Sequence, residues 1–142
     1  KKMRDTPKIF FVTAALCALC GMLWGIQMSA THDHTLSPAH GHLNLIGFVM
    51  MSVFGTYYAL TPVAGGSRTA KMHFALSAAT VLVLTPGIAL AISGKTEVLA
   101  QIGSVLAVLS MALFGFAILK FGVGRASHRS SPHSDLPHQP AK

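Results

Sequence analysis

The segment "HGHLNLIGFVMMSVFGTYYAL", residues 40–60, contains no Lys, Arg, Asp or Glu. At a rise of about 1.5 Å per residue, a helix of this length crosses the hydrocarbon core of a membrane, which is about 30 Å thick. Lipid offers no hydrogen-bond partners, so an α-helix, which satisfies its own backbone, is the expected form. The segment therefore predicts a transmembrane helix that carries two histidines near its start.

Three further apolar blocks of similar length surround this segment, at residues 9–29, 72–93 and 98–121. Short linkers, residues 30–39, 61–71 and 94–97, predict that consecutive helices are antiparallel neighbours. Only 11% of the 142 residues are charged, whereas soluble domains carry about 25%. The predicted fold class is all-α, an integral membrane up-down four-helix bundle formed by residues 1–121 and followed by a tail at residues 122–142.

Positive charge is distributed unevenly between the two sides of this bundle. The linkers at residues 30–39 and 94–97 share one cation, Lys95, and the other basic residues lie on the opposite side. Since basic segments stay cytoplasmic, both termini are predicted to be cytoplasmic in a bacterial inner membrane, with residues 30–39 periplasmic. The formal charge of +7 is then explained by juxtamembrane anchors in the lipid bilayer and not by nucleic-acid binding. These anchors are Lys1, Lys2, Arg4, Lys8, Arg68, Lys71, Lys120, Arg125 and Arg129.

The two ends of the chain allow other interpretations. A basic start also fits a cleavable secretory signal, although the sequence "MSA" before Thr31 is a poor cleavage site. The apolar stretch is longer than a signal core of about 7–15 residues, so we expect it to be retained as a helix. The tail is rich in Ser, Pro and His, which is typical of a flexible segment. Its histidines, at five-residue spacing, are interpreted as solvated and not as metal ligands: His128, His133 and His138.

Four of the eight histidines fall just before and at the start of the second span: His32, His34, His40 and His42. Histidine is the commonest metal ligand and an axial ligand of haem iron. All four are therefore candidate metal ligands on the periplasmic side. In a helix, positions i and i+2 point about 200° apart, so His40 and His42 are expected to serve different sites.

The two histidines of the span lie on different helix faces. Asn44 and Gly47 follow on the His40 face, and Gly47 leaves room there either for a flat macrocycle or for a close helix. Asn44 is expected to hold the His40 ring or to orient water or a propionate. The His42 face is apolar, as a porphyrin face requires, and includes Ile46. The candidate cofactor-binding residues are thus His40, His42, Asn44 and Gly47, and the alternative is that both histidines are hydrated interfacial residues.

The sequence "HGHLNLIGFV", followed by "FGTYY", resembles small bacterial four-span proteins related to subunit I of haem-copper oxidases. In that twelve-span family one helix carries a His-x-His pair, of which one histidine binds the low-spin haem and the other the oxygen-reactive haem. The resemblance implies that His40 and His42 bind haem, of the b type, and copper as a second cofactor. It also implies a role in electron transfer, gas sensing or haem handling.

The rest of the chain departs from that family, because an oxidase needs histidines on further helices. His73 alone occurs in another span, and its position at the opposite end from His40 favours an interfacial role. One chain therefore has too few ligands for a complete oxidase site, and whether the protein is an enzyme stays open. A homo-oligomer, trimer or dimer, or a larger membrane complex would complete the site. The alternative function is a cofactor-free accessory or scaffold subunit.

Small residues mark the first span. Gly21 and Gly25 form a Gly-x-x-x-Gly motif, and Cys17 lies one turn before it. Such stripes allow membrane helices to approach closely, here either within the bundle or between subunits. Cys17 and Cys20 have the spacing of a Cys-x-x-Cys pair, but thiols within lipid are poor thiolates, so we interpret them as small core residues.

Overall fold

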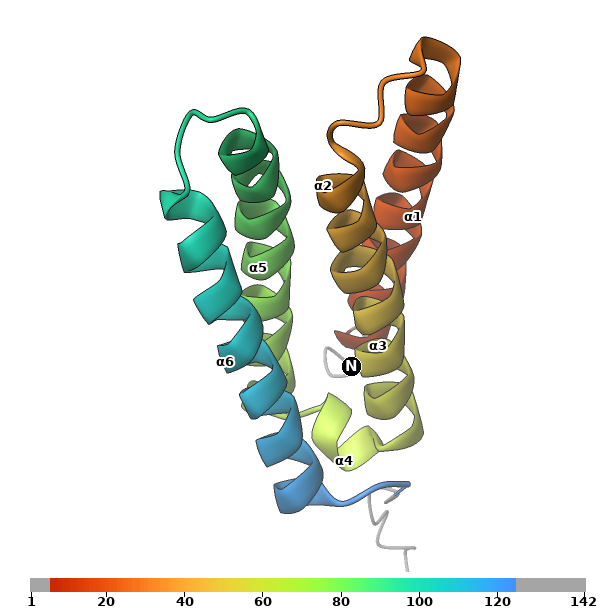
Figure 1. The fold of residues 1–142 in the computed structure, drawn as a ribbon. Helices are drawn as coiled ribbons and strands as arrows, with labels where there is room; N and C mark the ends of the chain where they lie inside the picture. The colour runs from red at the N-terminus through yellow and green to blue at the C-terminus, as the bar shows by residue number, and fades with distance from the viewer. Residues whose placement is uncertain (1–5, 125–142) are drawn as a thin grey trace, which may run out of the picture.

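The structure is a computed structural model that describes residues 6–124. Within this range it is built from helices and contains no strand. The predicted tail lies outside the described residues from residue 125 onward, as do residues 1–5. The helices are, in order, α1 (Thr6–Thr31), α2 (Ser37–His42), the π-helix η1 (Leu43–Met50), α3 (Met51–Leu60), α4 (Pro62–Gly65), α5 (Arg68–Ile92) and α6 (Val98–Phe121) (Figure 1).

Four helical stretches in the described range are long and apolar enough to cross a membrane. They are α1, the continuous run α2–η1–α3, α5 and α6, with mean hydropathies of 2.2, 1.5, 2.1 and 2.4 in their most apolar windows. These stretches confirm the all-helical class and the four spans, and they indicate a multi-pass membrane protein. The first three spans begin a few residues before the predicted apolar blocks, at Thr6, Ser37 and Arg68. The reason is that a helix continues into the polar membrane interface.

The second span changes its helical pattern directly after the histidine pair. Pro38 occupies the first turn of α2, where its missing N–H costs no helical hydrogen bond. From Leu43 to Met50 the helix is a π-helix, and it returns to α-helix at Met51. Segments of π-helix are rare and frequently occur at functional sites. The widened turns therefore draw attention to the segment that carries Asn44 and Gly47.

The four spans form two helical hairpins (Figure 1). In one hairpin α1 packs against η1 and α3, and in the other α5 packs against α6. Glycines allow α5 and α6 to pack closely, because a Cβ placed on Gly103 of α6 would lie only 2.6 Å from the Cα of Leu84 in α5. Gly87 of α5 meets the backbone of Ala100 in the same way. Close packing of small residues is a common means of joining helices in membranes.

We expect Gly103→Ala to lower the free energy of unfolding by about 1–3 kcal/mol, because the added methyl group meets a backbone that cannot yield without separating α5 from α6. Gly115→Ala in the same helix is the matched control, since a Cβ there has no atom within 4 Å. It should be neutral or stabilising by up to about 1 kcal/mol through helix propensity. Denaturant titration of both variants in detergent measures the difference, and equal stabilities would contradict the close packing.

The hairpins meet in an aromatic core at the end of the bundle that carries α4. Phe10 of α1, Phe54 and Tyr58 of α3, and Phe114 of α6 surround His73 of α5. Side-chain hydrogen bonds also join the helices and the chain segment after α6 at this end. The Tyr57 hydroxyl lies 3.1 Å from the Ala117 carbonyl and 2.9 Å from that of Gly122, and the Gly124 amide donates to Thr61 Oγ1 at 3.0 Å.

Candidate functional site

The His40 face of the second span packs against α1 within the same chain. A Cβ on Gly25 would lie 3.4 Å from Nε2 of His40, and a Cβ on Gly21 would lie 2.8 Å from Cγ of Asn44. One turn further, Gly47 faces Cys17, whose Sγ would lie 2.8 Å from a Cβ on that glycine. The sequence left either a flat macrocycle or a close helix as the partner of Gly47, and in the structure that partner is the helix α1. The Gly-x-x-x-Gly motif packs inside the bundle.

His40 is hydrogen-bonded to the backbone of α1. Its Nε2 lies 2.9 Å from the carbonyl oxygen of Gly21, which can only accept, so we assign the ring proton to Nε2. Asn44 Nδ2 donates to the His40 carbonyl at 3.0 Å and lies 3.1 Å from the same ring nitrogen. The Trp24 ring meets the imidazole edge-on, with ring centroids 5.9 Å apart. With the proton on Nε2, the ring is held by the Gly21 carbonyl, and Asn44, whose NH2 group cannot donate to a protonated nitrogen, is bonded to the His40 backbone carbonyl instead.

His42 has a different environment. Its Nδ1 lies 2.8 Å from the carbonyl oxygen of Pro38, one turn earlier. Because a carbonyl accepts, Nδ1 carries the proton, and Nε2 is left as an unprotonated nitrogen with no hydrogen-bond partner among residues 6–124. The side chain is half-buried. A backbone carbonyl on one ring nitrogen, with the other nitrogen free, is the usual arrangement of a metal-ligating histidine.

The remaining histidines of the cluster lie apart in the loop. His32 and His34 are exposed, and His32 has a backbone φ of 54° at the turn after α1. Between them Asp33 accepts a hydrogen bond from the Thr35 amide at 3.0 Å, and hydrogen bonding by Thr35 holds the pKa of Asp33 below its ordinary value. Residues 6–124 hold no group of three His, Cys, Asp or Glu side chains able to bind one metal ion. One chain therefore does not gather His32, His34, His40 and His42 into a metal site.

His73 is the buried polar residue that sequence reasoning missed. An interfacial, hydrated ring was expected, but the side chain has no exposed surface. Its Nδ1 lies 2.9 Å from the Tyr58 hydroxyl, and its Nε2 has no hydrogen-bond partner in the described part of the chain. A signal was available, because His73, Ser77 and Thr80 recur at i, i+4 and i+7, which is one helix face.

Aromatic rings enclose His73 on several sides. The Phe54 ring centroid lies 4.4 Å from the imidazole, and Phe114 stacks on it at 5.7 Å with an interplanar angle of 19°. Phe10 and Tyr58 lie at 5.7 and 5.8 Å. Ionisable groups inside a membrane are expensive and mark functional sites by default. His73 belongs to a different region from His40 and His42, at the α4 end of the bundle.

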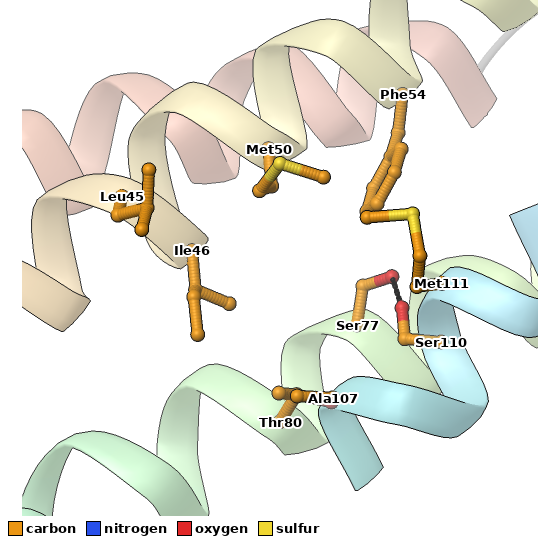
Figure 2. Close-up of a pocket in the computed structure, with 9 residues that line it drawn as sticks. All are labelled: Leu45, Ile46, Met50, Phe54, Ser77, Thr80, Ala107, Ser110 and Met111. Carbon is orange, nitrogen blue, oxygen red and sulfur yellow. Dashed lines mark hydrogen bonds between the residues drawn. The ribbon is translucent and has the colours of Figure 1, made fainter. Parts of the chain in front are cut away.

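A cavity of about 170 Å³ lies between the hairpins (Figure 2). One wall comes from η1 and α3 and the other from α5 and α6. Ser77 and Ser110 form a hydrogen bond of 2.8 Å at its α5–α6 side. Neither His40 nor His42 lines this cavity, which is bounded by Leu45, Ile46, Met50, Phe54, Ser77, Thr80, Ala107, Ser110 and Met111.

Comparison of the chain with protein families, with curated proteins and with solved structures gave no match. The resemblance of "HGHLNLIGFV" to a helix of haem-copper oxidase subunit I therefore stays a hypothesis that depends on this short segment.

Gly21→Ala should disturb the His40 site, and Gly25→Ala should be tolerated. At Gly21 the new methyl group takes the space of the Asn44 amide, so Asn44 loses its bond to the His40 carbonyl; at Gly25 the contact of 3.4 Å needs only a small shift. We expect Gly21→Ala to lower the free energy of unfolding by about 1–3 kcal/mol and Gly25→Ala to lower it by less than about 1 kcal/mol. Thermal unfolding in detergent compares them, and the reverse order would contradict this packing.

Proposed function

We propose that this protein is an integral membrane haem-binding protein related to subunit I of haem-copper oxidases, in which His42 is the axial ligand of a b-type haem. The observation that carries the proposal is the His42 ring, whose Nδ1 is bound to the Pro38 carbonyl at 2.8 Å while Nε2 has no partner among the described residues. The iron would supply one-electron and ligand-binding chemistry at this point. The protein's contribution is to fix the tautomer and direction of the imidazole.

The other candidate residues support His42 instead of binding iron. Ligation through Nε2 of His40 would require the ring to leave the Gly21 carbonyl. Asn44 and Gly47 fix the second span on α1, since the Asn44 amide packs against Gly21 and Gly47 accommodates Cys17. In this proposal they are positioning residues that determine the direction in which His42 points.

The space available favours a haem held between chains. Pockets for larger ligands have volumes of about 300–1,000 Å³, whereas the cavity inside the bundle has about 170 Å³. In this proposal the porphyrin therefore lies against the outer surface of the second span. Val49 and Val53 of this span are exposed. In a homodimer each copy supplies one His42, and in a trimer three four-span units imitate a twelve-span subunit. Copper would likewise require ligands beyond those that residues 6–124 of one chain bring together.

We further propose that the spans cross a bacterial inner membrane alternately, with both termini cytoplasmic and residues 30–39 periplasmic. The placement of cations supports this orientation. Lys8, Arg68, Lys71 and Lys120 belong to the helix ends near α4, whereas Lys95 lies in the loop between α5 and α6 at the other end. Basic residues favour the cytoplasmic side.

An absorption spectrum tests the proposed function. We expect the protein, purified in mild detergent from cells supplied with haem, to show a Soret band that shifts on reduction with dithionite. A colourless protein would overturn the proposal and favour the second candidate, a cofactor-free accessory or scaffold subunit. That candidate is supported by the internal packing of His40 on α1. The spectrum does not distinguish electron transfer, gas sensing and haem handling. Binding of carbon monoxide to the reduced protein would favour gas sensing.

A further inference from the structure

The cavity between the hairpins has the size of a small-molecule site. Its volume is about 170 Å³, and an apolar protein cavity of about 150 Å³ is known to admit benzene. Figure 2 shows Met50 and Phe54 on one side and the Ser77–Ser110 pair on the other. The cavity therefore has an apolar wall and a polar wall that face each other.

The cavity opens toward lipid. Leu45 of η1 and Met111 of α6 line it and are 54% and 46% exposed. The lining residues Phe54, Ser77 and Ser110 are buried. The opening thus lies between η1 and α6, on a surface that faces the bilayer in a membrane-spanning bundle. A molecule that reaches the cavity by this route must first dissolve in the membrane.

The polar wall has unused hydrogen-bonding capacity. The hydrogen bond between Ser77 and Ser110 uses one of their two hydroxyl protons, and the other has no acceptor among residues 6–124. Thr80 donates its own proton to the Leu76 carbonyl at 2.8 Å. All three hydroxyls retain lone pairs. At this depth no bulk water is available to satisfy these groups.

A ring with one oxygen matches the cavity better than water does. A buried water needs two to four polar partners, and these occur only at the wall that carries the serines. The remaining volume is bounded by Met50 and Phe54, which form favourable contacts with aromatic rings. We propose that the cavity binds a membrane-soluble, single-ring amphiphile of about the size of phenol, with its oxygen at Ser77 and Ser110. This site is independent of the proposed haem site.

Binding of 4-fluorophenol to the full chain in lipid nanodiscs, followed by ¹⁹F NMR, tests the proposal, with empty nanodiscs as the measure of partitioning. We expect saturable binding that is roughly 2- to 10-fold tighter than that of fluorobenzene, because only the phenol can use the serine pair. Ser110→Ala should remove this preference while fluorobenzene still binds. Ser104→Ala, an exposed hydroxyl on the same helix, is the matched control and should change neither affinity.

A second pair of variants tests the location. Ala107→Leu adds volume within the cavity and should abolish saturable binding of both rings, whereas Ala112→Leu, on the exposed face of α6, should leave it intact. Partitioning without saturation would overturn the proposal, as would equal affinities for the two rings. Capture of a brominated acyl chain in place of either ring would show that the cavity holds lipid and would also overturn it.

Discussion

His42→Ala is expected to abolish the Soret band of the haem-loaded protein, whereas His40→Ala retains most of it. The two histidines are two residues apart, but their hydrogen bonds differ in kind. The His42 ring is oriented by the Pro38 carbonyl, and its Nε2 has no partner within residues 6–124, while Nε2 of His40 is bound to the Gly21 carbonyl. Loss of the axial ligand should weaken haem binding by more than about tenfold, which corresponds to about 1.4 kcal/mol.

Two controls separate loss of the ligand from loss of the fold. Exogenous imidazole should restore the Soret band of His42→Ala, because the space left by the side chain accepts the free ligand. His34→Ala removes an exposed loop histidine and should leave the spectrum unchanged. If His40→Ala bleaches the protein while His42→Ala does not, the assignment of the ligand is reversed. If neither does, the haem is bound elsewhere.

The membrane spans were predictable because hydropathy acts over a whole helix. Some twenty consecutive apolar residues have no other stable environment than lipid or a large core, so errors were confined to the helix ends, as at Thr6 and Ser37. The partner of the Gly21–Gly25 stripe was not predictable, because a small-residue face accepts any helix that approaches it. The choice of the second span, through α2 and η1, follows from three matched contacts that become visible only when both helices are placed.

The surroundings of His42 could be predicted from the sequence, whereas those of His73 could not. The Pro38 carbonyl lies four residues before His42, so helix geometry places it within reach of the ring. The burial of His73 depends on residues far away in the chain, such as Phe10 and Phe114. Sequence position indicates the depth of a residue in the membrane, but not the side of the helix that neighbours cover. For that reason the sequence did not predict that the His73 ring is buried, and its interfacial depth stays a prediction.

His73→Ala is expected to lower the free energy of unfolding by about 3–5 kcal/mol, as for truncation of a buried aromatic ring. The imidazole contacts aromatic residues of α1, α3 and α6, so its removal leaves a hole where the hairpins meet. The Tyr58 hydroxyl also loses its partner at 2.9 Å. Urea or SDS titration in mixed micelles measures the loss, with Ser104→Ala as an exposed control.

A double-mutant cycle separates the hydrogen bond from the packing. Tyr58→Phe should lower the free energy of unfolding by about 1–2 kcal/mol, which is the upper range for side-chain hydrogen bonds in membranes. The reason is that both nitrogens of His73 are then without partners among the described residues. In Tyr58→Phe/His73→Phe both polar groups are replaced by rings of similar shape, and such pairs are nearly neutral or stabilising. A double variant as stable as the natural chain would mean that the His73–Tyr58 pair is not required for folding. A double variant less stable than either single variant would contradict the hydrogen bond as the source of the coupling.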